Sequence, residues 1–98
     1  MSEMSLTFAA DPGHGWLLVT EEQMKEAGVR AGHFSRFSYY DPETRTFALE
    51  EDCDAALFLK ALEKSGIEPT IWDERHTDGD SFVRSWPPIT RRFEFEPA

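Results

Sequence analysis

Positive charge is the scarcest property of this 98-residue sequence. Ten Lys and Arg stand against nineteen Asp and Glu, which leaves a formal net charge of −9. Proteins that bind free DNA or RNA neutralise phosphates with Lys and Arg, so this composition argues against a nucleic acid as the direct partner. The shortage is local: residues 41–54 carry six acids and one base, residues 67–80 carry five acids and one base, and the remaining segments together are neutral.

Cysteine and long apolar runs are also scarce. The one cysteine, Cys53, excludes an internal disulfide framework and favours a reducing compartment. The longest apolar run, residues 55–59, is far too short to span a membrane, and the first residues lack the basic and apolar segments of a secretory signal. Apolar residues still make up 40% of the chain, which is too hydrophobic for a disordered acidic tail. We therefore expect one cytoplasmic domain, residues 1–98, with a single core.

The first half of the hydrophobic pattern predicts a strand followed by a short helix. Residues 15–19 form an apolar run after a loop that contains proline and glycine, which indicates a buried strand. Thr20 and Gln23 have the spacing of a capping box, in which each side chain binds a free backbone N–H at the helix start. Gly28 is expected to end this helix, because glycine readily adopts the left-handed cap conformation.

Two further strands are expected to form a hairpin. Residues 34–40 are rich in aromatic side chains, and residues 46–50 place Phe47 and Leu49 on one face. Residues 41–44 between them are typical of a turn, since proline presets its backbone angle and aspartate can accept a hydrogen bond from the backbone ahead. Aromatic side chains on a sheet can stack on RNA bases, but the absence of a basic strand motif favours core packing here.

The second half of the pattern predicts a longer helix and a fourth strand. An apolar stripe with helical spacing indicates a helix over residues 53–65, with Asp52 as its N-cap and Gly66 at its end. The stripe consists of Ala55, Phe58, Leu59 and Leu62. Residues 67–76 are expected to form the fourth strand, beginning near Pro69.

The resulting order, strand–helix–strand–strand–helix–strand, predicts a small α+β domain of the split βαβ, or ferredoxin-like, type with an antiparallel sheet. Residues 4–9 and 92–96 are candidates for extra edge strands. The side chains expected in the core are Trp16, Leu18, Phe47, Leu49, Phe58, Leu62 and Ile71.

A ferredoxin-like strand order would bring the two acidic segments together. Strands 46–50 and 67–76 would run in the same direction on either side of strand 15–19, so their ends would lie about 10 Å apart. The acids at this end are the candidate partner-binding residues: Glu50, Glu51, Asp54, Asp73, Glu74, Asp78 and Asp80. Asp52 is left out of this set because of its expected role as a helix cap.

The acidic segment 50–54 has two other interpretations. It can be a solvated strand end with a helix cap, or a divalent-cation site, although its spacing matches no calcium loop. The three scattered histidines and Cys53 lack the paired spacing of a zinc site, and carboxylates around Cys53 oppose a reactive thiolate. No nucleotide-binding or hydrolase fingerprint is present. We therefore expect no enzyme activity, no metal and no cofactor.

Three segments, 13–17 (GHGWL), 37–39 (FSY) and 49–54 (LEEDCD), followed by Phe58 and Leu59, resemble a group of small uncharacterised proteins from bacteria, phages and mobile elements. The resemblance covers roughly residues 13–76 and implies no particular activity. In size and charge the chain also resembles anti-CRISPR and anti-restriction proteins, which are small acidic inhibitors of host defence.

Charge and resemblance together predict a non-enzymatic inhibitor that binds a nucleic-acid-handling protein complex, such as a CRISPR effector subunit, and competes with DNA or RNA. An exposed tryptophan among Trp16, Trp72 and Trp86 would be a candidate anchor for that partner. The alternative is a regulatory module that forms a homodimer through a sheet edge, its acidity serving solubility. A third interpretation is a metal-dependent enzyme that uses the carboxylates of residues 50–54.

Overall fold

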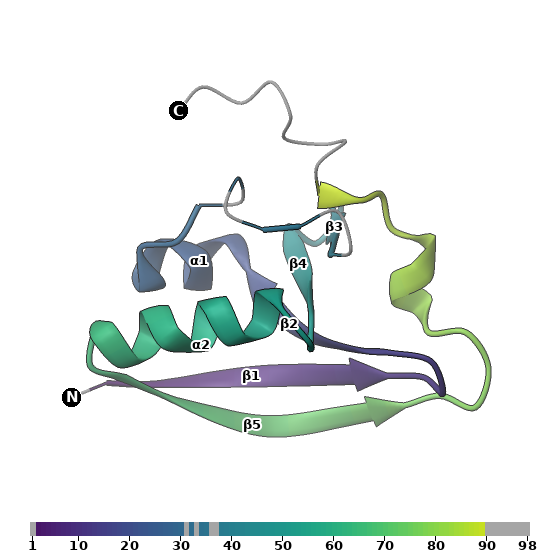
Figure 1. Ribbon diagram of the computed structural model, residues 1–98, viewed down its shortest axis with the longest axis horizontal. Coiled ribbons are helices and arrows are strands. Elements are labelled where there is room, and N and C mark those ends of the chain that lie inside the picture. Colours follow the sequence, from purple (N-terminus) through teal and green to yellow (C-terminus); the bar gives the residue numbers. More distant parts are fainter. Residues whose placement is uncertain (1, 31, 33, 36–37, 90–98) are drawn as a thin grey trace.

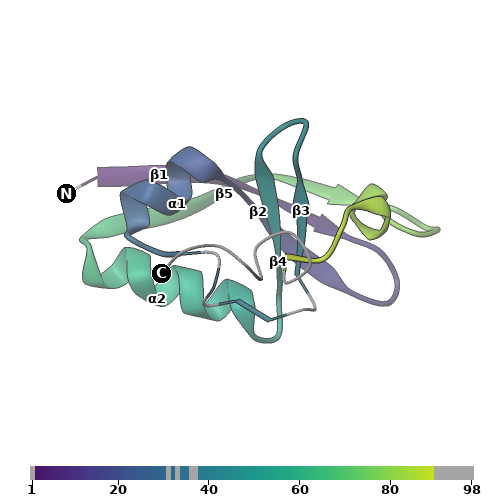
Figure 2. The same ribbon diagram turned by 90° about the horizontal axis from the view of Figure 1, so that it is seen from above.

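A five-stranded mixed sheet carries two helices on one face and a short 3₁₀ helix on the other (Figures 1 and 2). The computed structural model describes residues 2–30, 32, 34–35 and 38–89. The elements in chain order are β1 (Ser2–Ala10), β2 (Gly15–Thr20), α1 (Glu21–Ala27), β3 (Tyr39–Asp41), β4 (Thr46–Glu50), α2 (Asp54–Lys64), β5 (Ile67–His76) and the 3₁₀ helix η2 (Phe82–Ser85). The α+β class expected from the sequence is confirmed.

The strand order differs from the expected one. Across the sheet the order is β3-β4-β2-β1-β5, with β1 antiparallel to β2 and parallel to β5. The N-terminal strand, expected at most as an edge strand, therefore lies between β2 and β5, where a ferredoxin-like sheet would have these two in contact. The ferredoxin-like antiparallel arrangement is not confirmed, because β1 separates its first and last strands and makes the sheet mixed.

The short-range signals around α1 are confirmed. The Thr20 hydroxyl accepts the Gln23 backbone N–H at 3.1 Å, and the Gln23 side chain accepts the Thr20 N–H at 3.0 Å. Gly28 ends the helix in the left-handed region, with φ of 70°. Gln23 also donates its side-chain amide to the Ser5 carbonyl at 2.9 Å, which links α1 to β1.

Apolar side chains on the two faces of the sheet form a large core and a small one. The large core lies under α1 and α2 and includes Leu17, Leu49 and Phe58. The small core lies under η2 and consists of Ala9, Trp16, Ala48 and Val83. Neighbouring residues of one strand point to opposite faces, so Trp16 and Leu17 belong to different cores.

Five of the seven side chains expected in the core are buried: Trp16, Phe47, Leu49, Phe58 and Leu62. Leu18 is partly buried against the small core. Ile71 is 44% exposed, so its expected burial is wrong. The reason is its position: β5 is an edge strand and has a neighbour on one side only.

Two expectations around α2 and β3 also differ from the structure. Asp52 is exposed and caps nothing, because α2 begins at Asp54 and Cys53 occupies the N-cap position without a side-chain cap bond. The aromatic segment 34–40 contributes regular strand only at its end, since β3 begins at Tyr39. Residues 36–37 of that segment, and the candidate strand 92–96, lie outside the described residues.

One edge of the sheet is covered by another segment of the chain, and the other edge is open. The outer side of β3 is covered by residues 87–89, because Tyr40 donates its N–H to the Pro87 carbonyl at 2.9 Å and Ile89 donates to Ser38 at 3.0 Å. The outer side of β5 has no such neighbour in the part of the chain that the structure describes. That strand is exposed along almost its whole length.

Candidate functional site

Three parallel strands, β4, β1 and β5, end at the same end of the sheet, as the pairing directions require. Their register places Glu50, Trp16, Ala9 and Arg75 in one cross-strand row at this end. The candidate acids thus lie at the ends of two strands that run in the same direction, as expected, or just after them. Both β1 and β2 lie between them, so the separation is three strand spacings, about 14 Å, instead of two.

The seven candidate acids divide into accessible and buried ones. The accessible set is Glu51, Asp73, Glu74, Asp78 and Asp80. Glu50 and Asp54, by contrast, are only 5% and 4% exposed. Both carboxylates are hydrogen-bonded inside the domain, so they do not belong to its open acidic surface.

Asp54 fastens the loop before β3 to the start of α2. Its carboxylate accepts the Ser35 backbone N–H at 2.9 Å, the Ser35 hydroxyl at 2.7 Å and the Ser38 hydroxyl. The Ser38 oxygen in turn accepts the Glu50 N–H at 2.9 Å. This chain of bonds connects β4, α2 and the loop, so the role of Asp54 in this structure is to hold the backbone at the site together.

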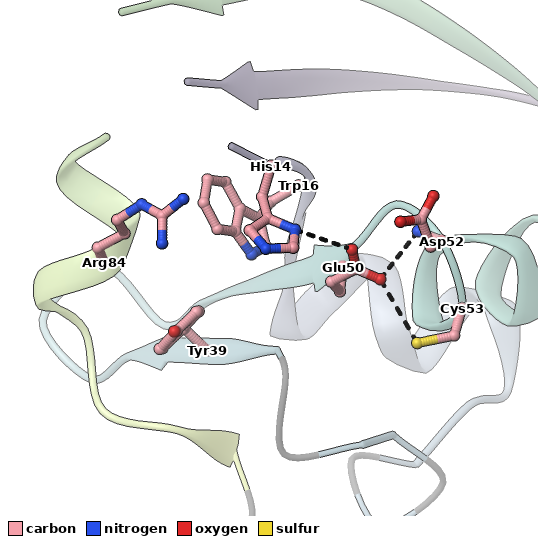
Figure 3. A pocket seen from close by; sticks show the side chains of 7 residues that line it. All are labelled: His14, Trp16, Tyr39, Glu50, Asp52, Cys53 and Arg84. Atoms are coloured by element: carbon pink, nitrogen blue, oxygen red, sulfur yellow. Dashed lines mark hydrogen bonds and ion pairs between the residues drawn. The ribbon is translucent and has the colours of Figure 1, made fainter. Parts of the chain in front are cut away.

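Glu50 lies at the floor of a hollow of about 340 Å³ on the face of the sheet that carries η2 (Figure 3). One carboxylate oxygen accepts the Asp52 N–H at 2.9 Å and the Cys53 thiol at 3.5 Å. The other lies 3.4 Å from Nδ1 of His14, whose side chain is 51% exposed. The β1–β2 loop, the end of β4 and the turn before α2 thus meet at one buried carboxylate.

Arg84 forms the opposite side of the hollow and is already paired. Its guanidinium binds both carboxylate oxygens of Asp11, with Nη2 at 2.9 Å from Oδ1, and its Cζ lies 5.2 Å from the centroid of the Trp16 ring. The second Asp11 oxygen also accepts the Ser81 N–H at 3.0 Å. A side chain at Gly13 would approach the guanidinium to 2.9 Å, so glycine permits this close contact.

Aromatic rings make up the walls of the hollow. Tyr39 meets Trp16 edge to face with centroids 6.2 Å apart, and the His14 ring lies 6.0 Å from Trp16 on another side. Trp16 is 1% exposed, and its ring nitrogen is a buried donor without a hydrogen-bond partner among the described residues. In Figure 3 the His14 ring overlaps the edge of the indole that carries this nitrogen, and the nitrogen itself is covered by surrounding atoms.

Cys53 also lines the hollow, but its environment opposes nucleophilic chemistry. Desolvation raises the pKa of the Cys53 thiol, and the Asp54 and Glu50 carboxylates raise it further against a lowering by Ser35. The thiol therefore stays protonated at neutral pH and donates to Glu50. In the described residues, no group of three or more His, Cys, Asp and Glu side chains is placed to hold a metal ion.

Exposed apolar side chains accompany the acids on β5. Trp72 is 67% exposed and Ile71 44% exposed, directly before Asp73 and Glu74. The register with β1 shifts here: Leu6 pairs with Ile71 and Thr7 with Asp73, so Trp72 is an extra residue in a β-bulge. Bulges re-aim side chains and occur next to functional sites.

The hollow was missed by sequence analysis because four separate segments build it. His14, Tyr39 and Arg84 come from a loop, a short strand and a 3₁₀ helix, and none of these positions has a motif. The one local signal is Asp11 in a loop with proline and glycine, since aspartate commonly accepts backbone N–H groups in such turns.

Comparisons of this chain with protein-family models, with curated proteins and with solved structures found no match. None of the helices in the described part of the chain has the length and apolarity needed to cross a membrane.

Proposed function

We propose that this protein is a non-enzymatic inhibitor that docks its acidic sheet end onto a basic, nucleic-acid-binding surface of another protein and competes there with DNA or RNA. The observation that carries the proposal is the shared direction of β4 and β5, which takes the acids after β4 and those at the end of β5 and beyond to one end of the domain. A basic groove that normally holds phosphates is the surface that such a charge distribution fits. A subunit of a host-defence complex, of the kind that anti-CRISPR proteins inhibit, is the partner class we propose.

Of the accessible acids at this end, Asp73 is paired with Arg75 at 3.1 Å, and within the part of the chain that the structure describes the other four have weaker cationic partners or none. Among the described residues, Glu51 and Asp78 have no cation within ion-pair distance, and Glu74 has only the His76 ring at 3.7 Å. Asp80 is 91% exposed and lies 3.9 Å from Arg84, which Asp11 already binds. Uncompensated exposed carboxylates speed association with a basic partner and make the affinity fall with salt.

Trp72 supplies an apolar contact with the partner, which the carboxylates cannot make. Exposed charge pairs contribute little binding energy each, whereas a buried tryptophan commonly contributes several kcal/mol to an interface. Trp72 is 67% exposed and lies directly before Asp73 and Glu74 in the edge strand β5. We therefore assign Trp72 as the anchor and the surrounding acids as the groups that select a basic partner.

A homodimer through β5 is the weaker alternative. An open edge strand can pair with a second copy, but this strand carries Pro69, the bulge at Trp72 and a run of charged side chains. Each of these features opposes edge-to-edge pairing. Two copies would also bring acidic strands together, and their like charges would repel.

The test reverses four exposed acids of the site and compares them with four exposed acids elsewhere. The site variant carries Lys at Glu51, Glu74, Asp78 and Asp80. The matched control, with the same change of net charge, carries Lys at Glu3, Glu26, Glu43 and Glu63. All eight positions are exposed, so both variants should fold as the wild type does, which circular dichroism checks.

Each immobilised protein is then exposed to a bacterial lysate at physiological salt, with and without added double-stranded DNA. Wild type and control should retain the same nucleic-acid-binding protein and release it when DNA is added, and the site variant should not retain it. The proposal is wrong if the site variant retains that protein as the wild type does, or if DNA does not displace it.

A further inference from the structure

The hollow around Glu50 carries excess negative charge. Glu50 and Asp52 contribute two carboxylates, and Arg84 is the one cation among its lining residues. Both carboxylate oxygens of Asp11 bind one edge of that guanidinium, so the charge of Arg84 is already paired. Among the described residues, Asp52 has no cation within ion-pair distance and Glu50 has only the His14 ring, at 3.4 Å, so the field in the hollow favours a positively charged group.

The walls suit a flat cation. Tyr39, Trp16 and His14 are among the residues that line the hollow, and cations bind well over aromatic faces. Arg84 already shows this chemistry inside the domain, since its guanidinium lies over Trp16 while it binds a carboxylate. Guanidinium combines stacking on a ring with two parallel bonds to a carboxylate, which an ammonium group cannot do.

The unpaired N–H of Trp16 indicates that the occupant of the hollow also carries a hydrogen-bond acceptor. A buried donor without a partner costs about 1–3 kcal/mol, and such groups in a native structure call for an explanation. A free cation offers no acceptor, but a peptide carries a carbonyl oxygen at every residue. The Trp16 nitrogen is covered in this structure, so binding of that oxygen would require the half-exposed His14 ring beside Trp16 to move aside.

We propose that this hollow binds an arginine side chain presented by a protein, with the guanidinium against Glu50 and Asp52 and a peptide carbonyl accepting the Trp16 N–H. The inference rests on the proposed function in one respect, which is that the arginine belongs to the basic partner. It gives the buried Glu50 a binding role that its low exposure would otherwise exclude, since the carboxylate is reached through the hollow. An arginine in a pocket is a typical anchor of an interface.

The probe is N-acetyl-arginine amide, added to the full chain and followed by NMR. Saturable binding in the millimolar range is expected, with a downfield shift of the Trp16 indole N–H and little change at Trp72, which lies outside the hollow. The control probe, N-acetyl-citrulline amide, has the same shape without the charge and should not bind. Equal binding of both probes, or binding that leaves the Trp16 N–H unmoved, would overturn the assignment.

Two conservative substitutions test where the guanidinium of the arginine probe binds. Asp52 is exposed, so Asp52→Asn should leave folding unchanged, and it is expected to weaken the binding of the arginine probe about two- to fivefold. Glu50→Gln is expected to weaken this binding more strongly. Asp78→Asn removes an exposed acid outside the hollow and should change nothing. Equal effects of the changes at 52 and 78 would contradict the site. If the probe fails to bind while the fourfold charge reversal still abolishes partner capture, only the arginine site is refuted and the acidic docking surface stands.

Discussion

Replacing Asp54 by alanine should destabilise the domain far more than replacing its neighbour Asp52. Asp54 is 4% exposed and accepts two bonds from Ser35 and one from Ser38, whereas Asp52 is exposed. Hydrogen bonds to a charged group contribute about 1.5–3 kcal/mol each, and bonds that share one acceptor do not add fully. We therefore expect Asp54→Ala to cost about 3–4 kcal/mol, and Asp52→Ala less than about 0.5 kcal/mol.

The assay is equilibrium unfolding in urea followed by circular dichroism, with the slope of the transition checked for constancy. A loss of this size is a large share of the stability of a small domain, so the Asp54 variant should show a clearly lower midpoint. Ser35→Ala provides the matched partner for a double-mutant cycle, which should return a coupling above about 0.5 kcal/mol. Equal losses at positions 52 and 54, or a loss below about 1 kcal/mol at 54, would refute the structural role assigned to this carboxylate.

Two further predictions test the core and the loop beside the hollow. Phe58→Ala removes a fully buried ring from the large core and should lower the free energy of unfolding in urea by about 3–5 kcal/mol. Leu57, on the same helix, is 41% exposed, so Leu57→Ala should cost less than about 0.5 kcal/mol. Similar losses for the two variants would mean that the buried face of α2 is misassigned. Bonds from Arg84 and the Ser81 N–H lower the pKa of Asp11 well below its ordinary value of 3.8, so this carboxylate stabilises the fold above that pH and the contribution is lost as the pH falls below it. Asp11→Asn should therefore flatten the acid side of the stability–pH curve, and an unchanged slope would contradict the pairing.

Elements whose signals lie within a few residues were predicted well. The capping box at Thr20, the strand β4 and the span of α2 each depend on neighbouring side chains, and the structure has them where the sequence placed them. The position of β1 was not predictable in this way. Its alternating pattern indicates a strand, but its neighbours in the sheet are set by pairing with residues 67–76, far along the chain. The same long-range choice left Ile71 at an edge, where an apolar side chain remains exposed.

For the candidate site, the sequence shows which side chains are acidic, but it does not show which of them are exposed. Glu50, Glu51 and Asp54 are equivalent acids in the sequence, yet only Glu51 is exposed. The difference comes from donors outside the acidic segment: Ser35 and Ser38 bond to Asp54, and His14 lies against Glu50. The spatial positions of those donors depend on the turn into β3 and on the β1–β2 loop, which no motif in the acidic segment specifies.

The central position of β1 has a consequence for the order in which this domain can be made. Ser2 pairs with Ile67 and Ala10 with His76, so one side of the first strand has no partner until the last strand leaves the ribosome. The hairpin of β1 with β2 can form early because its loop is short, whereas closing the sheet against β5 requires joining distant segments at an entropic cost. Nascent chains that stop before residue 67 would expose the free side of β1, a template for pairing with other chains. Synthesis of β5 is thus the step at which the growing chain changes from an aggregation-prone intermediate to a closed domain.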